Sequence, residues 1–419
     1  MNNLKRFFST FTAEKLEQLL FFFTVLFLPT QLSKHFWPYF STIFSIKTDY
    51  FSPVIYGWDL LVGFLLALFF YQRKKLKPTP LFLFLFFIIT QLISFFSIGN
   101  IGSGFVRLEQ YLVIGLFGVY IASQTFTFIK KSLYFGLVGS VFYSAVLAIV
   151  QVVHGGTIGF WILGERTFSL DTISIATFDW YGQVFLRAYA TFPHPNVLAS
   201  FFLVAIGLII WLREQKVKSN YLEIEWMVLI IGSFGLVLTF SRVALVFFGF
   251  IFAYLLKNRI KLFGIIFLFL LPFLYVRFHS AFNFDQLSFI RREELALQAF
   301  AMINNNILFG VGLNNFIYQL AYSSPVSGEI RFLQPVHNIF LLNQVETGVL
   351  GTTGFILLVS TAVLKVWKTQ QRKLLLFIWI SILGLGFFDH YFLTLAQGQR
   401  LLFLVWGISM LEYEDARNT

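Results

Sequence analysis

Long apolar stretches recur along most of the chain, and they restrict its fold more than any other feature. A helix of about 20 apolar residues crosses a bilayer, and in lipid the backbone must satisfy its own hydrogen bonds, as a helix does. The sequence predicts such spans near residues 15–32, 56–72, 80–97, 106–126, 132–152, 196–212, 225–240, 243–256, 262–276, 339–364, 374–389 and 399–412. We therefore expect an all-α polytopic membrane protein of about 12 transmembrane helices, with residues 1–419 as one integral membrane domain.

The composition excludes several classes of protein. Charged residues make up 12% of the chain, whereas a soluble globular protein carries about 25%, so a water-covered fold is excluded. The chain has no cysteine, which excludes thiol catalysis, disulfides and cysteine-ligated metals. The net charge of +11 does not indicate a nucleic-acid groove, because the basic residues form short clusters between apolar runs.

These basic clusters predict the orientation in the membrane. Lys and Arg concentrate in cytoplasmic loops, and a cytoplasmic N-terminus places these clusters inside: residues 73–75, 130–131, 213–218, 257–261 and 365–373. Both termini are then cytoplasmic, and two long loops, 154–195 and 277–336, face outward. The second loop, between spans nine and ten, is expected to contain short helices, one of them over 288–303 with Leu295, Ala299 and Met302 along one side.

Two arginines at predicted outer span ends are candidates for binding an anion. Arg187 lies in the stretch 186–196, just before a span, where it is either a snorkelling anchor or a bidentate phosphate ligand. Arg242 follows Ser241 at a tight turn between two apolar runs. An ionisable residue at such a place faces a cavity or a partner, and the alternative to a cavity is an ion pair with Asp59 or Asp389.

Candidate acid–base and polar residues lie at the same predicted level. His337 joins the largest loop to a span, and imidazole titrates near neutral pH, so it is either a general base or a structural residue. Glu346 on that span orients His337 or binds sugar hydroxyls, or it is a buried carboxyl group bonded to the helix. His194, between two prolines, is a ligand or an ordinary loop residue, and Asn196 is expected to cap the next helix.

Three further features bear on the same region. Gly348, Gly351 and Gly354 at three-residue spacing predict a close helix contact. The run 291–294 is either a solvated helix face or part of a site. Asp389 and His390 are possible metal ligands, but no second cluster has convincing ligand spacing, so neither a metal nor a cofactor is predicted.

Taken in order, four segments resemble the O-antigen ligase and polymerase family of membrane glycosyltransferases. The segments are Arg187 with 193–196, then 239–242, then 291–316 with Phe-Gly-Val-Gly at 309–312, and finally 336–338 followed by 346–351. The resemblance covers roughly residues 180 to 410, while the first five predicted spans match only in hydropathy. A tryptophan often found in the family's loop helix is not evident, which leaves the acceptor open.

The resemblance implies transfer of a glycan from a polyprenyl-diphosphate carrier to an acceptor hydroxyl on the outer face of the cytoplasmic (inner) membrane. By position, Arg187 and Arg242 correspond to the family arginines that hold the diphosphate, and His337 to the histidine proposed to activate the acceptor. The expected substrate-binding residues are His194, Asn196, Arg291, Asn338 and Glu346. The implied partners are the lipid-linked donor, a glycolipid, glycan or protein acceptor, and membrane lipid, as in lipopolysaccharide assembly.

Other functions stay open on the sequence alone. A polymerase that joins lipid-linked repeat units, or a protein O-glycosylating relative, fits the same segments. A transporter or flippase of a lipid-linked substrate is the alternative of another class, but it predicts repeat-related halves and broken helices, and the sequence indicates neither. A non-catalytic assembly partner would not need the set of arginines and histidines at the outer face.

Overall fold

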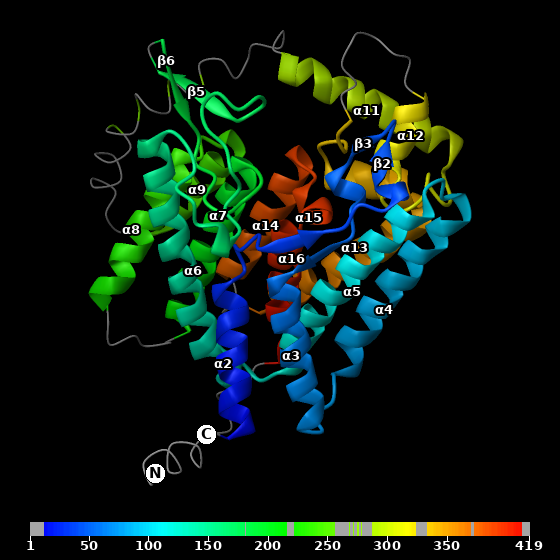
Figure 1. Ribbon diagram of the computed structural model, residues 1–419. Coiled ribbons are helices and arrows are strands. Elements are labelled where there is room, and N and C mark those ends of the chain that lie inside the picture. The colour runs from blue at the N-terminus through cyan, green and yellow to red at the C-terminus, as the bar shows by residue number, and fades with distance from the viewer. Residues whose placement is uncertain are drawn as a thin grey trace, which may run out of the picture.

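In the computed structural model the chain forms a bundle of helices with three two-stranded sheets in its connections (Figure 1). The structure describes residues 12–180, 182–215, 222–255, 268, 271, 275, 278, 287–323, 333–369 and 373–412. The helices are α2 (Ala13–Leu26), α3 (Gly57–Tyr71), α4 (Pro78–Ile93), α5 (Ile101–Ser123), α6 (Phe126–His154), α7 (Pro195–Glu214), α8 (Leu222–Leu238), α9 (Arg242–Leu255), α11 (Leu287–Asn305), α12 (Phe316–Ser323), α13 (Ile339–Trp367), α14 (Lys373–Phe388), α15 (Tyr391–Thr394) and α16 (Ala396–Met410).

Five helices of the described chain are long and apolar enough to cross a membrane. They are Pro78–Ser97, Ile101–Ser123, Phe126–His154, Pro195–Glu214 and Ile339–Trp367. A helix also coincides with each other predicted span except 262–276, of which the structure describes only isolated residues. The chain is thus a mostly helical protein with membrane-spanning helices, and the number of twelve spans stays a prediction.

The expectation of an all-α fold is wrong in two connections between helices, the one from α2 to α3 and the one from α6 to α7. β1 (Ser33–His35) pairs with β4 (Val54–Tyr56), β2 (Thr42–Ile43) with β3 (Ile46–Lys47), and β5 (Thr177–Trp180) with β6 (Gln183–Leu186), all antiparallel. Short 3-10 helices, η1 (Tyr39–Ser41), η2 (Asp49–Phe51), η3 (Ser94–Ser97) and η4 (Trp161–Leu163), lie in the same kind of segment. A hydropathy window of about 20 residues is too long to detect strands of this length.

Close contacts between helices depend on glycine. A Cβ on Gly407 of α16 would lie 2.6 Å from the carbonyl oxygen of Gly118 on α5, so these two helices meet at their backbones. Gly354 of α13 faces Thr90 of α4, as its predicted role in a close contact requires. Gly348 does something else: its φ of 63° interrupts α13, and it packs against the backbone of Leu308. Small residues therefore allow both the close packing and the kink.

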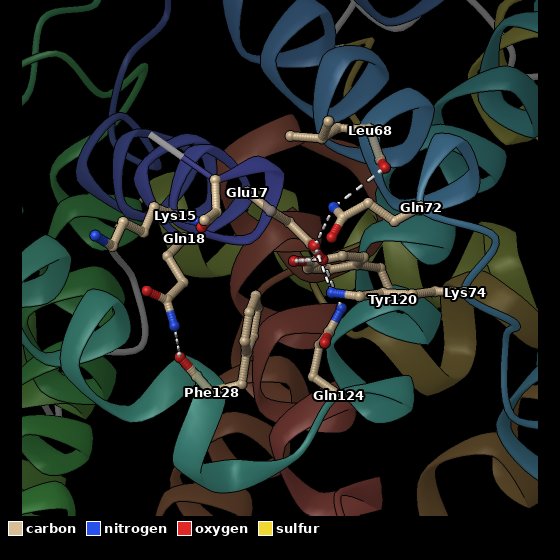
Figure 2. A network of polar contacts seen from close by, with 10 residues as sticks. Lys15, Glu17, Gln18, Leu68, Gln72, Lys74, Tyr120, Gln124 and Phe128 are labelled. Carbon is tan, nitrogen blue, oxygen red and sulfur yellow. Dashed lines mark hydrogen bonds and ion pairs between the residues drawn. The ribbon is translucent and has the colours of Figure 1, made fainter. Parts of the chain in front are cut away.

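The end of the bundle where α2 begins is joined by a buried carboxylate (Figure 2). Glu17 is fully buried, and its oxygens accept from Lys74 Nζ at 2.6 Å, Gln72 Nε2 at 2.7 Å, Tyr120 Oη at 2.9 Å and Gln124 Nε2 at 3.0 Å. A buried charge needs such partners to offset its desolvation. The cluster ties α2 to the ends of α3 and α5, and we call this the clamp end of the bundle.

The opposite end holds the hairpins and the beginnings of α7 and α13 (Figure 1), and we call it the loop end. Here α11 (Leu287–Asn305) covers the segment predicted to be helical within the loop 277–336, and its residues Leu295, Ala299 and Met302 are buried. The loop after α11 docks on the kink of α13, where Val311 N donates to Val345 O at 2.9 Å. The described part of this loop from α11 to residue 316 is thus packed onto the bundle.

Candidate functional site

A cavity of about 610 Å³ lies at the loop end. It is bounded by the first strand pair, η4, the start of α7, the segment before α13, and α15 with the start of α16. Its lining includes imidazoles, carboxylates, guanidiniums, amides and aromatic rings: Gln31, Ser33, His35, Asp49, Tyr50, Tyr56, Gln110, Trp161, Glu165, Arg166, His194, Asn196, Arg292, Gln334, His337, Asp389, His390, Thr394 and Gln397. A large polar cavity of this size matches the usual dimensions of a ligand site.

Asp389 is the centre of a hydrogen-bonded cluster in this cavity. It follows α14 directly, and its Oδ1 accepts from the backbone N–H of His390 at 2.8 Å. Its Oδ2 accepts from Asn196 Nδ2 at 3.1 Å, which joins the end of α14 to the start of α7. One carboxylate thus fixes two segments that are far apart in the sequence.

Two imidazoles stand beside this carboxylate. The rings of His337 and His390 are 5.1 Å apart, and His390 Nε2 lies 3.9 Å from Asp389 Oδ1. The other ring nitrogen of His390, Nδ1, lies 2.6 Å from Thr394 Oγ1, and this hydrogen bond fixes the orientation of the ring. His337 Nδ1 is buried and has no hydrogen-bond partner among the described residues. Among the described residues, Nδ1 of His390 thus has a hydrogen-bond partner, whereas Nδ1 of His337 has none and can accept a proton.

Arg187 is connected to the Asp389 cluster through Asn196. It follows β6 and is buried, with Nε donating to Thr239 O at 2.7 Å and Nη2 donating to Asn196 Oδ1 at 2.9 Å. A guanidinium has five N–H donors, so these bonds leave donors for a ligand. Asn196 thereby links Arg187 to Asp389. The structure brings Arg187 and His337 to one site, although they are far apart in the sequence.

His194 caps α7 and lines the same cavity. Its Nδ1 accepts from the backbone N–H of Asn196 at 3.1 Å, so a neutral ring carries its proton on Nε2. The expectation that Asn196 would be the N-cap is wrong. Pro195 occupies the first helical position, where its missing N–H costs nothing, and this moves the cap to His194 and leaves Asn196 free to bridge Arg187 and Asp389.

Burial and mutual charge set the protonation of the cluster. Burial raises the pKa of Asp389, but the neighbouring histidines and Arg292 outweigh it, and the pKa falls to about 2. Burial lowers the pKa of His194 and of His390 to about 3 and also lowers that of His337. Burial, with the charges of Arg242 and Arg292, lowers the pKa of Arg187 to about 10. At neutral pH the site therefore holds an aspartate, neutral imidazoles and a charged guanidinium.

Residues 227–356 match the family model described as O-antigen ligase. This stretch is similar to the O-antigen ligase family, and we call residues 227–356 the ligase domain. No curated protein matches the chain significantly. The match runs from α8 into α13 and includes Arg242, Arg292, His337 and Glu346, while Arg187 and Asp389 lie outside it. It supports an enzyme of the O-antigen ligase or polymerase type, similar to a membrane glycosyltransferase.

Within the ligase domain, two arginines lie near Arg187. Arg242 is the first residue of α9, three residues after Thr239, whose carbonyl accepts from Arg187. On α11 it is Arg292, rather than the predicted Arg291, that lines the cavity, with Nη1 donating to Phe388 O at 3.3 Å. Arg242 and Arg292 are near enough to lower the pKa of Arg187. Of these three arginines, Arg292 belongs to the cavity lining, and Arg187 and Arg242 add positive charge close to it.

Two other expected ligands in the ligase domain hold the backbone. Asn338 is the N-cap of α13, and its Oδ1 accepts from Phe340 N and Leu341 N, both at 2.9 Å. Glu346 is buried beside the kink in α13, where its Oε1 accepts from Phe316 N at 3.3 Å and its carbonyl accepts from Gly312 N at 2.9 Å. Glu346 thus anchors the segment 309–316, whose glycines adopt positive φ. Neither residue lines the cavity.

One group of side chains has the composition of a metal site. The ligand atoms of His337, Asp389 and His390 all lie within 4.8 Å of one another. Imidazole and carboxylate suit several divalent cations. The same three groups also suit proton transfer, because a neutral imidazole beside a carboxylate is an oriented base.

Sequence reasoning undervalued three members of the site. The sequence marks Asp389 and His390 only as possible metal ligands, and Asp389 also as an ion-pair partner. It leaves the run 291–294, which contains Arg292, open between a solvated helix face and part of a site. The usable signal was an ionisable pair at the end of an apolar span, since such residues seldom occur there without a function. Gln31, Trp161 and Gln397 carried no such signal.

Proposed function

We propose that this protein transfers a glycan from a polyprenyl-diphosphate carrier to an acceptor hydroxyl on the outer face of the cytoplasmic membrane. The observation that carries the proposal is one cavity in which His337, with an uncommitted nitrogen, adjoins Asp389 while Asn196 links that aspartate to the buried Arg187. The O-antigen ligase domain supports the reaction class.

The proposed step needs a base and fixed positive charge. His337 accepts the proton of the acceptor hydroxyl as that oxygen bonds to the anomeric carbon of the donor glycan. The bond between this carbon and the diphosphate oxygen breaks, and its electron pair leaves with the polyprenyl diphosphate. Arg187, Arg242 and Arg292 stabilise the charge that develops on the diphosphate. Asp389 stabilises the imidazolium that His337 becomes.

The proposed reaction does not need a metal. A diphosphate is already a good leaving group, and the three arginines supply the charge that a cation supplies in many soluble glycosyltransferases. His337 and Asp389 then work as a base and its positioning group. His390, whose ring is oriented by Thr394, packs beside His337 in the cavity lining.

The first test is transfer by the purified protein. We expect purified protein with lipid-linked glycan extracted from the source membranes to form a new glycosidic bond to an envelope acceptor fraction and to release polyprenyl diphosphate. Excess EDTA should leave the rate within about twofold, because the proposed step uses no metal. Removal of a metal that contributed even about 1.4 kcal/mol to the transition state would lower the rate about tenfold. Mass spectrometry of both products measures this, and heat-inactivated protein is the control.

The outcomes of this test separate the candidate functions. A product that lengthens the lipid-linked glycan itself indicates the polymerase, and a glycosylated polypeptide indicates the protein-modifying relative. Movement of the donor across a vesicle without a new bond indicates a transporter and contradicts the proposal. Loss of transfer in EDTA that zinc or magnesium restores contradicts metal independence alone.

The proposed orientation has a direct test, because the natural chain has no cysteine. Thr172 lies in the predicted outer loop 154–195, Lys75 lies in a predicted cytoplasmic cluster, and both side chains are exposed. We expect Thr172→Cys in intact cells to react with a membrane-impermeant maleimide and Lys75→Cys to react only after permeabilisation. The reverse labelling would overturn the orientation and the outer location of the site.

A further inference from the structure

The cavity lining also carries polar groups that the proposed transfer does not use. Gln397, in the first turn of α16, lines the cavity with its side chain 2% exposed, and its Nε2 has no hydrogen-bond partner among the described residues. Gln31 lines the same cavity, and its buried Oε1 also lacks a partner in that part of the chain. A buried amide without a partner is costly, so these atoms need a ligand.

Hydrogen bonds between α16 and the segment after α2 bring these two glutamines to one wall of the cavity. Arg400 lies three residues after Gln397 on α16, and its Nη1 donates to Thr30 O at 2.9 Å and to Leu28 O at 3.1 Å. Thr30 directly precedes Gln31 in the chain. Residues three apart share a helix face, so α16 presents Gln397 beside the segment that carries Gln31.

An aromatic ring stands at the edge of this wall. Trp161 lines the cavity and is 77% exposed. Its 3-10 helix is fixed to the same segment, because Leu163 O accepts from Thr30 Oγ1 at 2.7 Å and from Gln31 N at 3.3 Å. Tyr56, also in the lining, packs its ring over the guanidinium of Arg400, 4.9 Å away. An exposed indole beside unpaired amides offers a flat apolar surface with polar groups around it.

We propose that Gln31, Gln397 and Trp161 form a subsite for a neutral sugar ring. Sugar hydroxyls both donate and accept, so vicinal hydroxyls match an amide N–H from Gln397 and an amide oxygen from Gln31. The apolar face of the ring stacks on Trp161. The proposal rests on the proposed function, and it extends it by naming the residues that select the glycan.

The position of the subsite in the chain fits a role in specificity. Gln31, Trp161 and Gln397 all lie outside residues 227–356, which match the O-antigen ligase family, whereas His337 and Arg292 lie inside. The segments before and after the ligase domain thus supply the subsite, and the ligase domain supplies His337 and Arg292 to the same cavity. The sugar bound there belongs either to the donor glycan or to the acceptor.

Binding measurements in nanodiscs test the subsite with three probes. The first is undecaprenyl diphosphate without sugar, the second is the glycan-bearing carrier lipid extracted from the source membranes, and the third is a lipid-free oligosaccharide fraction of the same envelopes. The variants are Gln397→Leu, Gln31→Leu and Trp161→Ala. Gln18→Leu is the matched control, because Gln18 is an amide at the clamp end that donates to Phe128 O (Figure 2).

We expect Gln397→Leu and Gln31→Leu each to weaken binding of one glycan probe roughly 3- to 10-fold, the loss of one or two hydrogen bonds. Binding of the sugar-free carrier should stay at the wild-type value. Trp161→Ala should weaken the same probe, and Trp161→Phe should restore most of the loss. Gln397→Leu and Gln31→Leu should keep the melting temperature of the wild type, because Gln397 Nε2 and Gln31 Oε1 have no hydrogen-bond partner among the described residues.

Each outcome decides the proposal. A loss confined to the second probe assigns the subsite to the donor glycan, and a loss confined to the third assigns it to the acceptor. Equal binding of all probes by Gln397→Leu and Gln18→Leu overturns the subsite, as does a wild type that binds neither glycan better than the sugar-free lipid. Failure of the wild type to bind undecaprenyl diphosphate would instead contradict the proposed function, and the third probe would still decide the subsite.

Discussion

The variant His337→Ala should lower glycan transfer per folded molecule by roughly 10²–10⁴-fold, the usual contribution of a positioned general base. Donor binding should remain near the wild-type value, because the proposed diphosphate ligands are arginines. Single-turnover transfer and equilibrium binding of the lipid-linked donor, measured on the same preparation, separate the two effects. Folded yield after size-exclusion chromatography corrects for any loss of stability.

The pH profile gives this prediction a second readout. Burial lowers the pKa of His337, so the ring is a neutral base at pH values below the usual 6.5. The acid limb of kcat/KM should therefore lie below pH 6.5. Asp389 raises the pKa of His337, so Asp389→Asn should move the limb to still lower pH. His154→Ala is the control, since His154 is exposed at the end of α6. Transfer by His337→Ala near the wild-type rate would exclude His337 as the base.

Hydropathy predicts the helices well and the connections poorly. Apolar runs locate helices such as α7, which is Pro195–Glu214 where 196–212 was expected, because burial in lipid depends on composition over many residues. The strand pairs β1–β4 and β2–β3 escape this signal, since their order comes from backbone pairing between short segments rather than from a run of apolar side chains. These pairs matter, because β1 borders the cavity.

The site was predictable where a single ionisable residue lies at a span end, and it was not predictable where contacts between distant segments decide. Arg187 and His337 are such residues. The link through Asn196 to Asp389 depends on α14 ending beside the start of α7, which no local pattern reveals. Arg292 differs from Arg291 only by one step, about 100° around a helix, and the buried face of α11 decides which of them lines the cavity. Gln31 and Gln397 carry no charge that a sequence pattern could reveal. They are identified as candidates only because Gln31 Oε1 and Gln397 Nε2 have no hydrogen-bond partner among the described residues.

For the donor side, Arg187→Ala should weaken binding of the lipid-linked donor by about 100-fold, since a charged hydrogen bond contributes about 1.5–3 kcal/mol. Arg187→Lys should weaken it by about tenfold, because lysine keeps the charge but loses the planar pair of N–H donors. The burial-lowered pKa of about 10 leaves Arg187 charged at pH 7 to 8, so the loss should be constant over that range. Isothermal titration with the extracted donor in nanodiscs measures both variants.

A purely structural role for Arg187 makes a different prediction, and Asn196 distinguishes the two. Arg187 donates to Asn196, and Asn196 in turn donates to Asp389. If Arg187 acts only by holding this link, Asn196→Ala should weaken donor binding as much as Arg187→Ala does. If Arg187 contacts the diphosphate, Asn196→Ala should retain most donor binding and lose transfer, because Asp389 no longer stays aligned with His337. Equal loss of donor binding in both variants, at equal folded yield, would remove Arg187 from the diphosphate site and leave Arg242 and Arg292 as the remaining candidates.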